Sequence, residues 1–157
     1  MKLNPGDKVG IISPSSFLRN REAVELGLDY LRSLELEPVL GEHVFDAFRY
    51  MAGTPEDRTA DLHRFSADPK KKAVFCPAGG SGSQYMLPLI DYELVRRNPK
   101  PLFGFSDNTA LQLGLYARAK AVTCTGFTLK YDFKNGHIDS FVDETLRTVI
   151  SGGRLDL

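Results

Sequence analysis

Three features that would point to particular classes of protein are missing from this sequence of 157 residues. Twenty basic and twenty acidic side chains leave no net charge, so nothing electrostatic favours nucleic acid or an acidic membrane as a partner. No apolar run approaches the roughly 18 to 20 residues that a membrane-spanning helix needs. The two cysteines, Cys76 and Cys124, are too few for a disulfide framework or a zinc site. Both lie in apolar, strand-like stretches, and we expect them to be buried, reduced thiols.

The amino-terminal segment also lacks the pattern of a secretion signal. MKLNPGDKVGII has a charge, a Pro–Gly turn and then a short apolar run. With the reduced cysteines, this predicts a cytoplasmic protein. What is present is the balance of an ordinary globular domain, with 42% hydrophobic and 25% charged residues. The length suits a single domain with its own core.

Short apolar segments alternate with segments of helical character along the chain. Five of the apolar segments are typical of buried strands: KVGIIS (8–13), EPVL (37–40), KAVFC (72–76), PLFGF (101–105) and AVTCTG (121–126). Between them, a stripe at spacings of three and four predicts a helix that buries Ala23, Leu26, Tyr30, Leu31 and Leu34. This alternation predicts βαβ units, and therefore a mostly parallel sheet covered by helices on both faces.

Other helices carry start and stop signals. Thr54 is the expected N-cap of a helix that begins at Pro55, and Asp57 completes a pattern like a capping box. Further helices are expected over residues 107–120 and 138–153, the latter closed by glycines.

Polar loops follow three of the expected strands, at residues 13–16, 79–83 and 106–108. Right-handed crossovers place the loops after parallel strands at one edge of the sheet, where such sheets bind ligands. We therefore expect these three loops to converge.

The segment GFSDNTA (104–110) places Ser106 on a sharp turn between a strand and a helix. Such a turn exposes the hydroxyl, and the free amides of the first helical turn favour negative charge nearby. The segment does not spell the G-x-S-x-G nucleophile motif, and taken alone it favours a simple helix cap. The glycine loop PAGGSGSQ (77–84) lacks the P-loop ending, but it offers backbone N–H groups at the same sheet edge. Together the two loops offer what acyl transfer requires.

The residues resemble a known family. PAGGSGSQYMLPLIDYELVRRNPKPLFGFSDNTAL (77–111) is similar to the core of the serine LD-carboxypeptidases, which include muramoyl-tetrapeptide carboxypeptidases and microcin C self-immunity peptidases. GDKVGIISPSS (6–16) and MAGTPEDRTADLHRFSADP (51–69) resemble the family's N-terminal domain. The resemblance extends from about residue 6 to about residue 126.

This resemblance implies an α/β fold of three layers, flavodoxin-like or Rossmann-like, and a serine hydrolase with Ser106 as nucleophile. It implies an oxyanion hole made by the backbone N–H groups of Asp107 and Gly79. The substrate-binding residues that it implies are Gly80, Ser81 and Ser83. Such enzymes need no metal or other cofactor. They release a C-terminal D-residue from cytoplasmic murein tetrapeptides, in peptidoglycan recycling, or act on related peptide conjugates.

A serine nucleophile also needs a general base, and none of His43, His63 and His137 matches a catalytic position of the family. The resemblance places the catalytic Glu and His in a second, β-rich, C-terminal domain. Residues 1–150 are therefore expected to form the nucleophile domain, and 151–157 the start of a linker to a domain that is absent. We expect the chain alone to be inactive, and to form homodimers as family members commonly do.

Two other interpretations stay open at this point. One is a non-catalytic α/β module that uses the same loops to bind a small anion or a peptide carboxylate. The other is a thiol enzyme built on Cys76, although Pro77 follows it directly, so no helix N-terminus is available to lower the pKa of the thiol.

Overall fold

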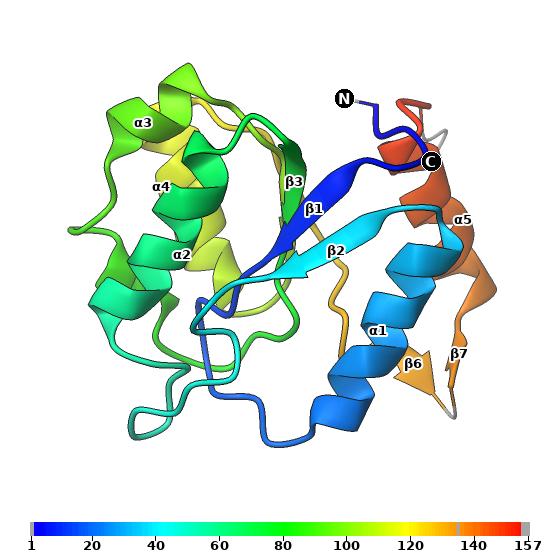
Figure 1. Cartoon of the computed structure of the whole chain (residues 1–157), viewed down its shortest axis with the longest axis horizontal. Coiled ribbons are helices and arrows are strands. Elements are labelled where there is room, and N and C mark those ends of the chain that lie inside the picture. Colours follow the sequence, from blue (N-terminus) through cyan, green and yellow to red (C-terminus); the bar gives the residue numbers. More distant parts are fainter. Residues whose placement is uncertain (1, 135, 155–157) are drawn as a thin grey trace.

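A five-stranded parallel sheet forms the centre of the molecule, which a computed structural model describes over residues 2–134 and 136–154 (Figure 1). The strands lie in the order β2-β1-β3-β4-β5, and each neighbouring pair is parallel. Their bounds are β1 Lys8–Ile11, β2 Glu37–Leu40, β3 Lys71–Phe75, β4 Leu102–Gly104 and β5 Thr123–Thr125. This is the flavodoxin-like strand order, in which the direction of winding reverses between β1 and β3. The predicted α/β fold with a mostly parallel sheet is confirmed.

Helices cover both faces of this sheet (Figure 1). On one face lie α1 (Arg21–Ser33) and α5 (Ser140–Ile150), with a small antiparallel hairpin of β6 (Phe133–Lys134) and β7 (His137–Ile138) beside them. The other face carries the remaining helices: α2 (Pro55–Ala67), the 3₁₀ turn η1 (Ser83–Met86), α3 (Tyr92–Arg97) and α4 (Asn108–Ala119). None of the helices in the described ranges has the length and apolarity to cross a bilayer.

Each face has its own hydrophobic core. The core under α1 and α5 includes Val9, Ile11 and Phe75, and the aromatic rings of Phe75 and Phe103 stack there with centroids 4.3 Å apart. The core under α2, α3 and α4 includes Leu62 and other fully buried aliphatic side chains. The three inner strands, β1, β3 and β4, are largely buried, and strands covered on both faces read as continuous apolar runs, which explains why these segments stood out in the sequence.

The start of α2 follows the sequence signal closely. Thr54 Oγ1 accepts a hydrogen bond from the N–H of Asp57 at 3.2 Å, and the Asp57 carboxylate accepts one from the N–H of Thr54 at 3.0 Å. With Pro55 in the first turn, this is the predicted capping box.

The buried face of α1 differs from the prediction. Leu26 was expected in the core but is 42% exposed, whereas Val24 and Leu28 are buried. The reason is Gly27, which faces the core: a Cβ atom there would lie 2.1 Å from the carbonyl oxygen of Leu129. The helix therefore approaches the backbone after β5 through its glycine, and this contact turns Leu26 outward.

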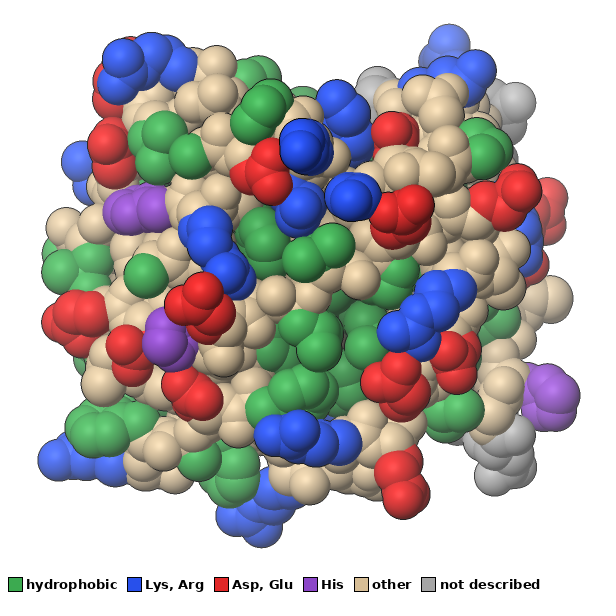
Figure 2. All heavy atoms as spheres, viewed as in Figure 1, with side chains coloured by type: hydrophobic (Ala, Val, Ile, Leu, Met, Phe, Trp, Pro, Cys, Tyr) green, Lys and Arg blue, Asp and Glu red, His purple; other side chains and the backbone are tan. Residues whose placement is uncertain are grey.

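The carboxyl-terminal helix α5 ends at Ile150, with Ser151 as its C-cap. Residues 151–154 follow without helix or strand, and the last three residues of the expected linker segment, 155–157, lie outside the described part. Figure 2 shows basic and acidic side chains interspersed over the face it presents, as a net charge of zero suggests.

Candidate active site

The three polar loops meet at the carboxyl edge of the sheet, as predicted from the topology. Ser15, in the loop after β1, has its hydroxyl 2.7 Å from Asp107 Oδ2 and 2.8 Å from Asn108 Oδ1. The side-chain amide of Asn108 donates to the carbonyl oxygen of Ala78, in the loop after β3, at 3.1 Å. Asn108 is fully buried, so it ties together the loops after β1, β3 and β4.

Ser106 occupies a strained turn between β4 and α4. Its φ of 62° lies in the left-handed region, which costs a residue with a side chain free energy. The side chain is exposed, and its hydroxyl makes no hydrogen bond with any described residue. An accessible hydroxyl on a strained strand-to-helix turn is the geometry of a nucleophile elbow.

The glycine loop lies against this hydroxyl. A Cβ atom on Gly79 would lie 2.8 Å from Ser106 Cβ and 3.2 Å from Ser106 Oγ, so only glycine allows this approach. Among residues 2–134 and 136–154, no acceptor lies within hydrogen-bonding geometry of the backbone N–H of Gly79 or of Asp107. These two N–H groups are therefore free to donate to an oxygen that gains negative charge beside Ser106.

The Asp107 side chain turns inward rather than toward solvent. Its Oδ2 accepts hydrogen bonds from the Ser15 hydroxyl and, at 2.9 Å, from the N–H of Ser83. The backbone oxygen of Asp107 also accepts from the Ser83 hydroxyl at 2.5 Å. Asp107 therefore contributes two groups: its N–H at the edge and a carboxylate that fixes the neighbouring loops. The sequence indicated the first role but gave no sign of the second.

Contacts with Ser16 fix the rest of the glycine loop. Gly80 has a φ of 123°, and a Cβ atom there would lie 2.1 Å from Ser16 Oγ. That same hydroxyl accepts a hydrogen bond from the N–H of Ser81 at 3.0 Å. Of the three residues expected to bind substrate, Gly80 and Ser81 are exposed, whereas Ser83 is fully buried against Asp107.

A hollow of about 400 Å³ opens beside Ser106. Its walls come from the loops that follow β3 and β4 and from the segment after β5. The lining residues are Gly79, Gly80, Phe105, Ser106, Thr128, Tyr131 and Asp132. Asp132 fixes the last of these segments, because its Oδ2 accepts from the N–H of Thr128 at 2.7 Å and from the Thr128 hydroxyl at 3.0 Å. Nothing in the local sequence of residues 128–132 singled them out, since only the sheet order brings them here.

No histidine lines this hollow among the described residues. His43 Nδ1 lies 2.7 Å from Asp46 Oδ2, and this hydrogen bond raises the pKa of His43 above its ordinary value. His63 Nε2 accepts a hydrogen bond from the backbone N–H of Asp91, the N-cap of α3. Burial lowers the pKa of His63. His137 lies on β7. The described ranges therefore place no histidine base beside Ser106.

The buried thiol of Cys76 does not fit a nucleophile. Cys76 is 1% exposed, and burial raises the pKa of its thiol far above the ordinary value. A thiolate is the reactive form of cysteine, so this burial makes the side chain inert. The structure thus argues against the interpretation as a thiol enzyme.

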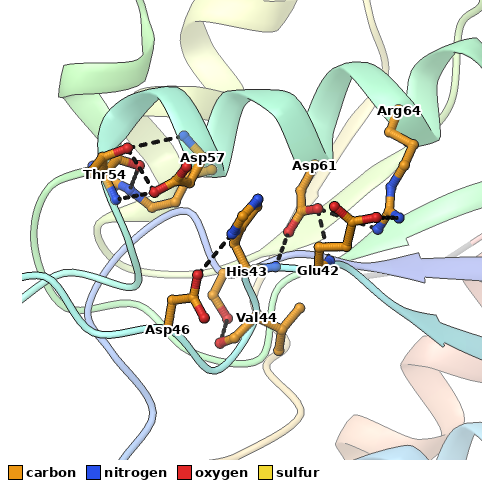
Figure 3. Close-up of polar contacts among 10 residues, drawn as sticks. Glu42, His43, Val44, Asp46, Thr54, Asp57, Asp61 and Arg64 are labelled. Carbon is orange, nitrogen blue, oxygen red and sulfur yellow. Dashed lines mark hydrogen bonds and ion pairs between the residues drawn. The ribbon is translucent and has the colours of Figure 1, made fainter.

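One group of side chains in the described part has the composition of metal ligands, and it lies in the loop after β2 and at the start of α2. Ligand atoms of His43, Asp46 and Asp57 lie within 4.8 Å of one another. Figure 3 shows that Asp57 already completes the capping box with Thr54 and that Asp46 pairs with His43. None of these residues lines the hollow beside Ser106.

The fold and site together define a class: an α/β protein with an exposed serine elbow at the carboxyl edge of a parallel sheet, beside two backbone N–H groups without an acceptor in the described ranges. The sequence model of one protein family, the LD-carboxypeptidase N-terminal domain, matches residues 9–126 of this chain. The chain belongs to this family, as the sequence resemblance predicted.

Individual similar proteins and solved structures support this assignment. A Streptomyces coelicolor protein named as a carboxypeptidase is 40% identical over 97% of this chain and 53% of its own length. The murein tetrapeptide carboxypeptidase of Pseudomonas aeruginosa is 40% identical over 66% of this chain and 34% of its own length. Among solved structures, microcin C7 self-immunity protein MccF in complex with aspartyl sulfamoyl adenosine matches with a TM-score of 0.86 and 28% identity, over 99% of this chain and 47% of that one. The chain thus spans about half the length of the relatives that it matches along most of its own length.

Proposed function

We propose that this chain forms the nucleophile domain of a serine LD-carboxypeptidase. In this proposal Ser106 attacks the carbonyl carbon of the L,D-amide bond, and the N–H groups of Asp107 and Gly79 stabilise the oxyanion. The amide bond breaks, and the C-terminal D-amino acid leaves while the rest of the murein tetrapeptide stays on Ser106 as an ester until water hydrolyses it. The single observation that carries the proposal is the strained, exposed Ser106 beside two backbone N–H groups that have no acceptor among the described residues.

The chain alone is proposed to be inactive. Deprotonation of the Ser106 hydroxyl requires a positioned base, and no described histidine lies in the hollow. The base and its orienting carboxylate then come from residues outside those described, as the family resemblance implies. We further propose that the protein works in the cytoplasm, in murein recycling, and as a homodimer.

The experiment compares the chain with a chimera in which the carboxyl-terminal half of the Streptomyces relative follows residue 150. Release of the terminal D-amino acid from a synthetic L,D-tetrapeptide is followed by mass spectrometry. The chain alone releases none, the chimera does, and Ser106→Ala in the chimera abolishes release. Ser140→Ala, which removes an exposed hydroxyl at the start of α5, away from the hollow, retains release.

A tetrapeptide ending in an L-residue serves as the stereochemical control. Turnover by the chain alone contradicts the requirement for an external base. A folded chimera without activity, or one whose activity survives Ser106→Ala, contradicts the proposed nucleophile and favours the alternative of a non-catalytic binding module.

The structural likeness to MccF with aspartyl sulfamoyl adenosine favours a second candidate substrate, an aminoacyl–nucleotide conjugate. The hollow has two exposed aromatic residues in its walls, Phe105 and Tyr131, against which a nucleobase can stack. Parallel assays of the chimera with both substrates decide between them, and the substrate with the higher kcat/KM identifies the peptide class.

A further inference from the structure

A buried arginine lies behind the Ser106 site. Arg58, on the first turn of α2, is 2% exposed and is among the largest fully buried side chains of the described residues. A buried charge is costly unless it is bonded to polar groups or balanced by an opposite charge. This burial lowers the pKa of Arg58, because it disfavours the charged form.

The guanidinium is satisfied by backbone oxygens of three separate segments. It donates to the carbonyl oxygen of Pro14 in the loop after β1, and to that of Gly82 in the glycine loop at 3.0 Å. Its Nε donates to the carbonyl oxygen of Thr54, at the start of α2, at 3.2 Å. The sulfur of Met51 lies 3.3 Å from the same group. One side chain therefore fixes the spacing between the two loops that flank the switch point of the sheet.

Both of these loops reach the nucleophile through their next residues. Pro14 is followed by Ser15, which bonds the carboxylate of Asp107. Gly82 is followed by Ser83, whose N–H and hydroxyl both bond Asp107. A displacement of either carbonyl would therefore be transmitted to the residue next to Ser106.

The positive charge of Arg58 lies on the same loop network as the negative charge of Asp107. The guanidinium of Arg58 and the carboxylate of Asp107 are bonded to adjacent residues of the glycine loop, Gly82 at 3.0 Å and Ser83 at 2.9 Å, although they make no ion pair with each other within the described part. The negative charge of Asp107 opposes the lowering of the pKa of Arg58 by burial. A carboxylate beside Ser106 disfavours a developing oxyanion, and a nearby cation offsets that effect.

We propose that Arg58 is a positioning residue of the Ser106 site, which holds the loops after β1 and β3 at fixed spacing and balances the charge of Asp107 beside the oxyanion amides. The inference rests on the proposed role of Ser106 as the nucleophile. Arg58 itself does not line the hollow, so it acts through Asp107 and the glycine loop.

The test places a reporter thiol at the nucleophile position of the full chain. In Ser106→Cys, the rate of alkylation by iodoacetamide is measured against pH, and mass spectrometry of the peptide that contains residue 106 separates it from the native cysteines. We expect a thiol pKa below the ordinary value of about 8.5, because the free amides at the start of α4 stabilise a thiolate.

Three variants are then compared in this background. Arg58→Met removes the charge at similar size and should slow alkylation at neutral pH about threefold, because losing one unit charge from a partly screened site raises the pKa of the thiol by about half a unit. Arg58→Lys keeps the charge but loses the planar fork, so alkylation should stay near the background rate. In the same variant, hydrogen exchange at residues 81–83 should rise about tenfold, the effect of losing one charge-assisted hydrogen bond. Arg97→Met removes an exposed cation from α3 and should change neither quantity.

The outcomes separate the inference from the proposed function. An ordinary thiol pKa in the Ser106→Cys background overturns the proposed nucleophile and this inference with it. A lowered pKa that folded Arg58→Met leaves unchanged overturns the inference alone. If Arg58→Met does not fold, Arg58→Lys decides: unchanged exchange at residues 81–83 in that folded variant overturns the inference, and raised exchange supports it.

Discussion

Replacing Ser106 by glycine should stabilise the protein, although the substitution removes the proposed nucleophile. The backbone of Ser106 has a φ of 62°, which costs a residue with a side chain about 1–2 kcal/mol. Glycine adopts this conformation freely but loses about 0.5–1 kcal/mol more conformational entropy on folding. The hydroxyl has no partner among the described residues, so nothing else is lost. The net gain in the free energy of unfolding should be about 0.5–1 kcal/mol.

Thermal unfolding followed by calorimetry measures this gain. For a domain of about 150 residues, 1 kcal/mol corresponds to about 2–4 °C in Tm, so Ser106→Gly should unfold about 2 °C above the parent. Ser106→Ala removes the same hydroxyl but keeps the backbone cost, and its Tm should stay close to that of the parent.

Two further variants control for the general effects of glycine. Lys120, the C-cap of α4, has a φ of 58°, so Lys120→Gly should stabilise by a similar amount away from the site. Ser81 does not have a positive φ, so Ser81→Gly should cost about 0.5–1 kcal/mol. Equal Tm values for Ser106→Gly and Ser106→Ala would contradict this prediction, because relief of backbone strain is what distinguishes the two variants.

Three more predictions concern the glycine loop and two of the histidines. Gly80→Ala should lower the free energy of unfolding in urea by about 2–4 kcal/mol, since it adds a collision with Ser16 to backbone strain, whereas Gly126→Ala adds strain in open space and should cost about half as much. His43 has a raised pKa, so its stabilisation is complete below about pH 6.5 and is lost as pH rises through the folded-state pKa. His43→Ala should therefore cost more at pH 5.5 than at pH 8.5, by less than about 1 kcal/mol because the pair is partly exposed to solvent. His63 has a lowered pKa, so its stabilisation is present above about pH 6.5 and is lost as pH falls, and His63→Ala should cost more at pH 8.5. A pH dependence of the same sign for both histidines would contradict these assignments.

Much of the fold was predictable because its signals are local. The apolar runs and the capping box at Thr54 and Asp57 depend on residues within a few positions of one another. The right-handed crossover rule then places the loops after parallel strands at one edge, which is why the convergence near Ser106 followed from the sequence.

The buried face of α1 was not predictable in the same way. Both Leu26 and Leu28 have aliphatic side chains on a helix, and periodicity alone does not say which one enters the core. The contact between Gly27 and the backbone at Leu129 decided this, and it joins segments about a hundred residues apart.

Local sequence signals set the alternation of strands and helices and the position of Ser106 at a strand–helix junction, because backbone propensity and hydrophobic period act over a few residues. Tertiary structure alone decided that the Asp107 carboxylate turns inward to Ser15, 92 positions away in the chain, and that Arg58 is buried behind it. In the sequence, Arg58 is one of several charged residues of a helix with no sign of burial. The order of the strands brings distant backbone oxygens around it, and these oxygens compensate the cost of removing its charge from water.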